Sequence, residues 1–559
     1  MARTNAGYTP LHIAAGEGSA AAAQLLLADP RVDPEAKDKL GHTPLSIAAL
    51  SGNADAARTL LADPRVQADA RDSQGCTPLF NATSTGSTPV ARLLLATNRV
   101  DPNARCGKDG PTPLAIAARN GSADIVASLI GHPRVDVNAA TRGCTPLHYA
   151  AEQGHAATVS MLLDDPRTAV DASDAPFGDT ALHVAARNGH AGVVDLFIAE
   201  SRVNVNAVRH DGATPLIVAA ENSHARVVSA LLSDTRVNPN QADRKGQTAA
   251  HLAAFSDHAA TMELLISDCR VDLCLNVDSS SASLSTPLQS TPLHIAVTAE
   301  CASIVALLTA TPRVDVNAPG LGHAGLLPLH VAAQLGAGEI VDLLLACPRV
   351  DPDAEVGPSG FTPLHVAAMY DQAHVIQRLV ACGRVNANAA TKDTAYTALY
   401  IAAHNGRVGA VKALLSDPRG VDVNARTSTG ATPLLVAAMS GHADIVALLL
   451  ACPYVDVNAG ARSPLLGAAM KGDARVASLL LSAPGVDVNW ACVETHRTPL
   501  LEAACAGHAA VVGLLLADDR VDQAARDADG STALVLARQA GHAAVVSLLQ
   551  APSALGRRG

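Results

Sequence analysis

Short apolar stripes alternate with polar turns along this chain, and the alternation repeats at a nearly constant interval. The segment Thr-Pro-Leu-His-Ile-Ala-Ala begins at Thr9, and variants of it return fifteen more times. They begin at Thr43, Thr77, Thr112, Thr145, Thr180, Thr214, Thr248, Thr291, Leu327, Thr362, Thr397, Thr432, Ser463, Thr498 and Thr532. Most starts lie 33 to 36 residues apart, with one gap of 43 and one of 31. A fixed period of this length is the signature of a repeat architecture.

The unit that begins at Thr145 shows how each repeat is expected to fold. Thr145 is a good helix N-cap, and Pro146 fits the first helical position, where its missing N–H costs nothing. A short apolar stripe follows, and Gly154 suits the left-handed conformation that ends a helix. A second stripe over residues 159–163 stops before Pro166, which cannot continue a helix. Neither helix can bury its stripe alone, so neighbouring units must stack.

The full pattern, T-P-L-H-x-A-A, G-H, V-V-x-L-L-L and V-D-V-N-A, is clearest over residues 432–459 and resembles the ankyrin repeat. The resemblance covers nearly the whole chain. It implies an all-α solenoid of stacked helix-turn-helix units with projecting hairpin fingers and a groove that binds proteins. Two departures stand out. Asp-Pro-Arg-Val or a relative follows the second helix, as at Asp29 to Val32, and the 31-residue gap before Ser463 predicts a shortened or missing finger.

The 43-residue gap predicts a division of the chain. It holds a serine-rich segment over residues 278–289, and Asp257 and Cys301 occupy the places expected for helix-ending glycines nearby. We therefore expect two stacks connected by a loop or joint. The expected parts are a first stack at 1–267, a joint at 268–290, a second stack at 291–551 and a short tail at 552–559.

Composition narrows the class of protein. Hydrophobic residues make up 48% of the chain but aromatic residues only 2%, which suits closely stacked thin helices. The net charge of −11 argues against a general nucleic-acid binder. Eleven cysteines without C-x-x-C spacing favour a reducing compartment. No apolar stretch approaches a membrane span or a signal peptide. We expect an intracellular, cytoplasmic protein without membrane insertion, and the nucleus remains an alternative.

Candidate cofactor and metal motifs all have a simpler structural explanation. Residues 320–325 match G-x-G-x-x-G, but no strand precedes them as a dinucleotide site requires. Cys269, Cys274 and His258 lack an evident fourth zinc ligand. Histidines recur at one repeat position, where the ankyrin resemblance implies a bond to the neighbouring loop. They are His12, His148, His183, His251, His294, His330 and His365. We expect no cofactor, no metal and no catalytic site.

An arginine recurs just past the second helix of most units. The series is Arg31, Arg65, Arg99, Arg134, Arg167, Arg202, Arg236, Arg270, Arg313, Arg349, Arg384, Arg419 and Arg520. A cation at a helix C-terminus complements the helix dipole by about 0.3–1 kcal/mol, so we favour a structural role. The alternative is a basic stripe for an acidic partner.

The scarce aromatic residues suggest where a partner binds. In the ankyrin family, the residues around the finger turn and the two residues after Ala-Ala face the groove. The candidates at or next to such places are Phe361, Met369, Tyr370, Tyr396, Tyr400 and His404. Binding hot spots favour large rings, which bury much area with little loss of rotamer entropy. The alternative is that these rings only fill gaps beside small neighbours.

Together these features predict a non-enzymatic scaffold or adaptor that binds proteins through its groove and finger tips. A second hypothesis is an architectural spacer, or a fragment of a larger multidomain ankyrin protein. An enzyme with an unrecognised site is the third.

Overall fold

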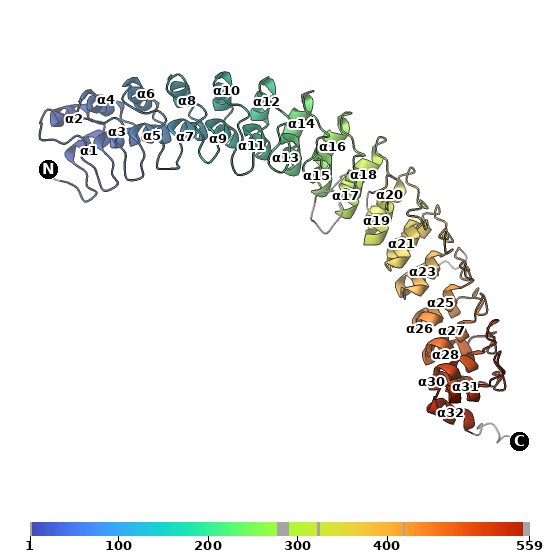
Figure 1. Ribbon diagram of the computed structural model, residues 1–559. Coiled ribbons are helices and arrows are strands. Elements are labelled where there is room, and N and C mark those ends of the chain that lie inside the picture. The colour runs from blue at the N-terminus through green and yellow to red at the C-terminus, as the bar shows by residue number, and fades with distance from the viewer. Residues whose placement is uncertain (1–2, 277–289, 321–324, 417–419, 552–559) are drawn as a thin grey trace. The chain divides into compact units, whose positions relative to one another are not determined.

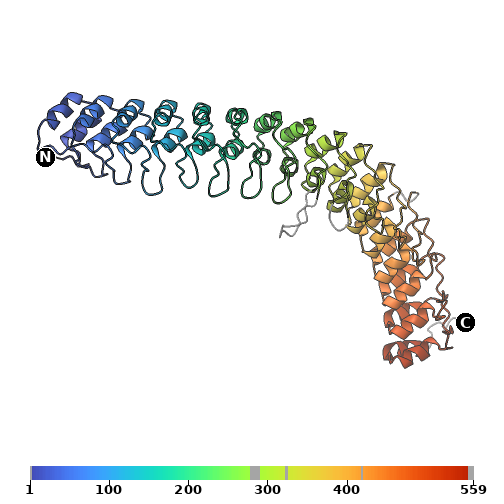
Figure 2. The same ribbon diagram turned by 45° about the horizontal axis from the view of Figure 1, so that its top comes forward.

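The computed structural model describes residues 3–276, 290–320, 325–416 and 420–551. Their contacts divide the chain into two compact units, unit 1 up to Asp272 and unit 2 from Leu273. Of the predicted joint, residues 277–289 lie outside the described residues, as does the predicted tail at 552–559. Each unit consists of two rows of antiparallel helices with loops projecting on one side (Figures 1 and 2).

The odd-numbered helices form the inner row and follow the Thr-Pro-Leu segments. In unit 1 they are α1 (Pro10–Gly16), α3 (Pro44–Leu50), α5 (Pro78–Ser84), α7 (Pro113–Arg119), α9 (Pro146–Glu152), α11 (Ala181–Arg187), α13 (Pro215–Glu221) and α15 (Ala249–Phe255). In unit 2 they are α17 (Pro292–Thr298), α19 (Pro328–Leu335), α21 (Pro363–Met369), α23 (Ala398–His404), α25 (Pro433–Ser440), α27 (Pro464–Lys471), α29 (Pro499–Ala506) and α31 (Ala533–Gln539).

The even-numbered helices form the outer row. In unit 1 they are α2 (Ala20–Leu27), α4 (Ala54–Ala62), α6 (Thr88–Ala96), α8 (Ala123–Ile130), α10 (Ala156–Asp164), α12 (Ala191–Ala199), α14 (Ala225–Ser233) and α16 (Ala259–Ser267). In unit 2 they are α18 (Ala302–Ala310), α20 (Gly338–Ala346), α22 (Ala373–Ala381), α24 (Val408–Leu414), α26 (Ala443–Leu450), α28 (Ala474–Leu481), α30 (Ala509–Leu516) and α32 (Ala543–Gln550).

The predicted all-α repeat fold is confirmed. Within the described residues the regular elements are all helices, and β-structure is limited to isolated bridges in the loops. The alanine pairs of the inner helices are buried, as at Ala150 and Ala151, which lets neighbouring helices approach closely. We call the loop between each outer helix and the next inner helix a finger.

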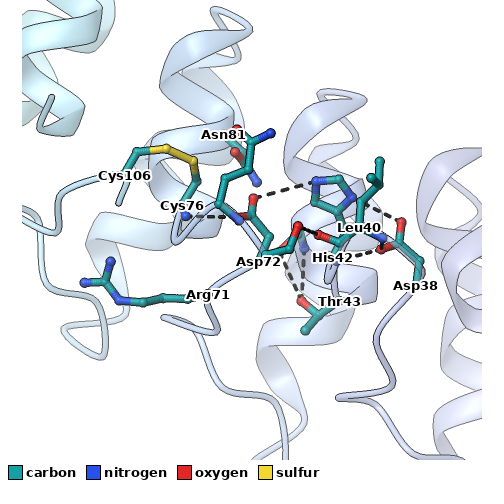
Figure 3. A network of polar contacts seen from close by, with 12 residues as sticks. Asp38, Leu40, His42, Thr43, Arg71, Asp72, Cys76, Asn81 and Cys106 are labelled. Carbon is teal, nitrogen blue, oxygen red and sulfur yellow. Dashed lines mark hydrogen bonds and ion pairs between the residues drawn. A yellow bond between two sulfur atoms is a disulfide. The ribbon is translucent and has the colours of Figure 1, made fainter. Parts of the chain in front are cut away.

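The fingers are held by short polar contacts within and between repeats. Asp38 accepts backbone N–H groups from Leu40 and His42 at 2.8 Å each, which closes the turn. The His42 ring lies 3.1 Å from the carboxylate of Asp38 and 3.7 Å from that of Asp72 on the next finger (Figure 3). One imidazole therefore connects two successive fingers.

A ladder of asparagines joins neighbouring repeats in the first part of many fingers, shortly after the outer helix. Asn138 donates its amide to the carbonyl of Arg167 at 2.7 Å and accepts the backbone N–H of Ala169 at 2.8 Å. The same two-way clamp is made by Asn103, Asn206, Asn240, Asn317, Asn388, Asn424, Asn458 and Asn489. Each clamp fixes the register between one repeat and the next.

One pair of cysteines is joined, although no two cysteines have C-x-x-C spacing. Cys76 and Cys106 form a disulfide with their Cα atoms 4.0 Å apart (Figure 3). They are 30 residues apart in sequence, but stacking places their fingers side by side. A search for C-x-x-C spacing cannot find a pair that the repeat period brings together.

We expect mass spectrometry of a non-reduced digest to recover the peptides of Cys76 and Cys106 as one linked species. Cys144, which also directly precedes a Thr-Pro-Leu segment and is a free thiol, serves as the matched control and should be alkylated. Full alkylation of Cys76 under the same conditions would contradict the disulfide.

Two smaller expectations are settled by the backbone. The left-handed residue that ends α17 is Glu300, with φ of 56°, and Cys301 is instead the N-cap of α18. The sequence assignment of Cys301 to that place was therefore wrong by one residue, whereas Asp257, with φ of 55°, does take the left-handed conformation.

The finger before Ser463 is shortened but still contacts its neighbour, because the Ala461 N–H donates to the carbonyl of Gly430 at 2.9 Å.

Candidate protein-binding site

Three of the six candidate residues line one hollow in unit 2. Phe361, Met369 and Tyr370 surround a space of about 300 Å³ together with side chains of Leu326, Val356 and Pro358. Tyr370 is 49% exposed and Phe361 is half-buried, so both rings present surface to solvent. The hollow lies between the finger at 356–361 and the ends of α19 and α21.

The finger fixes where the Phe361 ring lies. Val356 and Phe361 exchange two backbone hydrogen bonds of 2.8 and 2.9 Å, and Gly357 and Gly360 take positive φ values to close the loop. From the preceding repeat, the His330 ring contacts the carbonyl of Phe361 at 3.0 Å. The hollow is therefore built on a braced hairpin.

The other three candidates form a stack on α23 and the finger before it. The rings of Tyr396 and Tyr400 lie 4.5 Å apart, and those of Tyr400 and His404 lie 6.3 Å apart with nearly parallel planes. Tyr400 is only 8% exposed, and its burial, together with the neighbouring Tyr396, raises the pKa of its phenol to about 12. Tyr400 thus supports the stack, while His404 is exposed and Tyr396 is half-buried.

A second hollow, of about 490 Å³, begins at this stack. It is lined by Tyr400 and His404 and, from the next repeats, by Leu435, Met439 and Arg462. The structure therefore distributes five of the six candidates over two hollows of unit 2, and Tyr396 stacks on Tyr400 beside the second. We call the face formed by the fingers and the ends of the inner helices from α19 to α27 the inner face.

Sequence reasoning missed three exposed apolar residues on the inner face. Met439 and Met470 each follow a buried alanine pair directly, and Leu335 lies two residues after one. These are the positions that singled out Met369, Tyr370 and His404. Their position after the alanine pair identifies these three residues, whereas a criterion based on aromatic rings does not include methionine or leucine.

The repeated histidines are structural, as the family resemblance implied. The Nδ1 atom of His148 lies 2.8 Å from the hydroxyl of its N-cap Thr145, and its Nε2 lies 3.0 Å from the carbonyl of Asp179 in the next repeat. Burial lowers the pKa of His148, His183 and His330 to about 4. These rings are therefore neutral at physiological pH and join repeats to one another.

The arginine series is likewise structural. Arg167 donates to the carbonyls of Ile130 and Val135 in the preceding repeat and pairs with Asp165 in its own. Equivalent bonds to the preceding repeat are made by Arg65, Arg99, Arg134, Arg202, Arg236, Arg270, Arg349, Arg384 and Arg520. Arg419 lies outside the described residues. These guanidinium groups satisfy the carbonyls that end the outer helices, so the series needs no acidic partner.

The zinc-ligand candidate Cys274 contacts the backbone of the next repeat. Cys274 lies 3.5 Å from both the carbonyl of Arg313 and the backbone N–H of Asp315, where other repeats place the clamping asparagine. In the described part of the chain, no three His, Cys, Asp or Glu side chains are grouped so as to hold a metal. Residues 321–324 of the glycine motif lie outside the described residues. No described helix has the length and apolarity to cross a bilayer.

Comparison with known proteins agrees with this architecture. The chain matches the family model described as ankyrin repeats in three copies, in eight windows, most of which overlap. They cover 11–106, 98–174, 167–243, 235–320, 329–427, 385–461, 419–491 and 465–555. The comparison with curated proteins gave no match. Among solved structures, the human ASB11 ankyrin repeat domain is similar, with 27% identity over 42% of this chain and 99% of that chain, and a TM-score of 0.36.

Proposed function

Because the chain belongs to the ankyrin repeat family, we propose that it is a non-enzymatic scaffold or adaptor that binds a protein partner on the inner face of unit 2. Ankyrin repeats are generally protein–protein interaction modules. The family supports the class of function, and the two hollows of the inner face support the choice of this surface as the site.

One observation carries the proposal. The hollow beside Phe361, Met369 and Tyr370 exposes large apolar side chains on a finger that is held by its own hairpin and by the neighbouring repeat. Interface hot spots combine such rings with a pocket that excludes water. Because the finger is already ordered, a partner loses little free energy to ordering this surface.

The remaining parts of the proposal concern what the chain does not do and where it acts. The repeats occupy nearly all of the described residues, which favours binding over catalysis. The net charge of −11 favours a protein partner over nucleic acid. We place the activity inside the cell, because thiols such as Cys144, Cys347 and Cys452 favour a reducing compartment. The Cys76–Cys106 disulfide is the exception.

The test is a quantitative pull-down that compares the full chain with a Tyr370→Ala, Tyr396→Ala double variant. We expect partners of the inner face to bind the variant at least about 10-fold more weakly, because truncating a hot-spot ring costs roughly 2 kcal/mol or more.

The matched control is Phe255→Ala. Phe255 is an aromatic residue with 58% exposure that directly follows an alanine pair on α15 of unit 1. Its loss should leave those partners bound. If every captured protein binds the double variant and the parent equally, the inner face is not the binding surface. An architectural spacer would show no specific capture by either protein.

A further inference from the structure

Exposed and half-buried residues at the ends of the inner helices form a largely apolar series on the inner face. We call it the apolar track and define it as Leu335, Met369, Tyr370, Met439 and Met470, with His404 in the middle. Each lies one or two positions after the buried alanine pair of α19, α21, α23, α25 or α27. Leu335, Met439 and Met470 are 44%, 39% and 42% exposed. Five successive repeats therefore present apolar or aromatic surface at one place.

The fold itself does not require this apolar surface. At the same positions of unit 1, five of the eight inner helices have a charged residue. These residues are Glu17, Arg119, Glu152, Arg187 and Glu221. Three of the six methionines of the whole chain lie on the track. Methionine adapts its shape to different partners, and contiguous exposed apolar surface marks interaction sites. The track thus has the composition of a binding surface.

The charge beside the track is positive and uncompensated. Arg462 lines the second hollow and Lys471 directly follows Met470, and both are exposed. Within the described residues, neither makes an ion pair. These two cations are therefore available to a ligand.

Three acidic groups of the same face lie nearer its other end, and each has a polar partner. Glu355 pairs with Lys392 at 2.5 Å. Asp393 accepts a hydrogen bond from the hydroxyl of Ser359 at 3.0 Å, and Asp371 accepts the N–H of Ala410 at 2.6 Å. Asp371 and Asp393 keep their negative charge, but they lie two or three repeats before Arg462 and Lys471, and neither of these two cations makes an ion pair within the described residues. A ligand therefore meets apolar surface along the track and positive charge at its α27 end.

We propose that the ligand of the inner face is an acidic polypeptide segment that lies across α19 to α27. It places one apolar side chain in each hollow and its carboxylates against Arg462 and Lys471. This inference rests on the proposed function and adds the chemistry of the partner. The hollows lie two repeats apart, which corresponds to about 16–20 Å at the usual spacing of packed helices. An extended segment would span that distance with anchors about five or six residues apart.

The experiment starts from a random 16-residue peptide library displayed on phage and selected on the full chain. We expect the enriched peptides to carry net negative charge and two large apolar residues about five or six positions apart. Two enriched peptides are then synthesised, labelled with fluorescein and titrated by fluorescence anisotropy at low and high salt.

Charge reversal provides the decisive variant. Arg462→Glu with Lys471→Glu should weaken the acidic peptides at least about 10-fold and remove most of the salt dependence of their binding. Arg119→Glu on α7 of unit 1 is the matched control. It should change neither the affinity for the acidic peptides nor the salt dependence of their binding. Circular dichroism checks that the exposed substitutions leave the fold intact.

The outcomes separate this inference from the proposed function. If Tyr370→Ala with Met439→Ala weakens binding but charge reversal does not, the inner face binds proteins and the acidic chemistry is wrong. If neither variant changes the affinity, both proposals fail. Enrichment of basic or neutral peptides overturns the inference. So does a selection in which the parent chain enriches no peptide more strongly than the Tyr370→Ala, Met439→Ala variant does. Displacement of the peptides by a 20-nucleotide single-stranded DNA would point to nucleic acid instead and would also overturn it.

Discussion

Acidification from about pH 6.5 to about pH 4 is expected to destabilise the array steeply, well before most carboxylates are protonated. The buried rings of His148, His183 and His330 have folded-state pKa values of about 4, against 6.5 for an unperturbed histidine, because burial disfavours the imidazolium. Burial also lowers the pKa of His12, His294 and His365. The unfolded chain therefore takes up protons first as the pH falls.

The sign follows from this difference in proton uptake. Stability is complete above about pH 6.5, is lost as the pH falls toward 4, and then levels off with respect to these groups. Each ring with a pKa near 4 contributes on the order of 3 kcal/mol to the change. Burial raises the pKa of four acids, which act in the opposite direction but are fewer than the six histidines. They are Glu35, Asp69, Asp243 and Asp353.

Urea unfolding followed by circular dichroism at half-unit steps of pH measures this loss. His148→Leu is the informative variant, because repeat 13 naturally has Leu435 at that position. It should lower stability at pH 7.5 by about 1–2 kcal/mol, since Asp179 loses a hydrogen-bond partner, and should flatten the profile below pH 6.5. Parallel pH profiles for the variant and the parent would show that the ring does not titrate as described.

The second large effect is expected in the asparagine ladder. Exchanging asparagine and aspartate there should lower the stability of the chain at one position and raise it at another. Asn138→Asp replaces the donor that contacts the carbonyl of Arg167 with an acceptor, which should destabilise the chain by about 1–3 kcal/mol. Asp69→Asn should instead stabilise it by about 1 kcal/mol. Asp69 accepts the N–H of Asp101, but its Oδ1 is buried and makes no hydrogen bond among the described residues.

The reason for the gain at Asp69 is also a matter of charge. Burial is the largest cause that raises the pKa of Asp69, so its ionised form is unfavourable in the folded chain. The advantage of Asp69→Asn should therefore be greatest near neutral pH and should shrink in acid, where the carboxyl is protonated. Asp353→Asn provides an independent repetition in unit 2, since Asp353 Oδ1 is also buried without a hydrogen bond. If both Asp→Asn changes destabilised the chain, the asparagine clamp would not explain the expected preference for asparagine at this position.

Most of the fold could be predicted from the sequence because each element is specified locally and many times. Thr-Pro at the start of inner helices and Asp-Pro after outer helices fix the helix limits, and the period fixes the stacking. The exceptions concern contacts between repeats. The Cys76–Cys106 disulfide and the asparagine clamps join residues about 30 apart, and the pattern V-D-V-N-A shows the asparagine but not its partner.

The candidate site was only partly predictable for a related reason. Aromatic residues at finger and helix-end positions identified Phe361 and Tyr370, and both line the first hollow. The division into two hollows depends on which side chains of successive repeats meet, as when Met439 and Arg462 approach Tyr400. Tyr400 itself is buried because it takes the place of the structural histidine. Such details require the stacked structure.

Hydrogen–deuterium exchange of the full chain, with and without a bound peptide or protein partner, tests the central claim most directly. That claim is that the inner face of unit 2 is the surface where a partner binds. The account predicts new protection at the fingers over residues 356–361 and 391–396 and at the ends of α19 to α27. Protection confined to unit 1, or to the outer helices of unit 2, would contradict it.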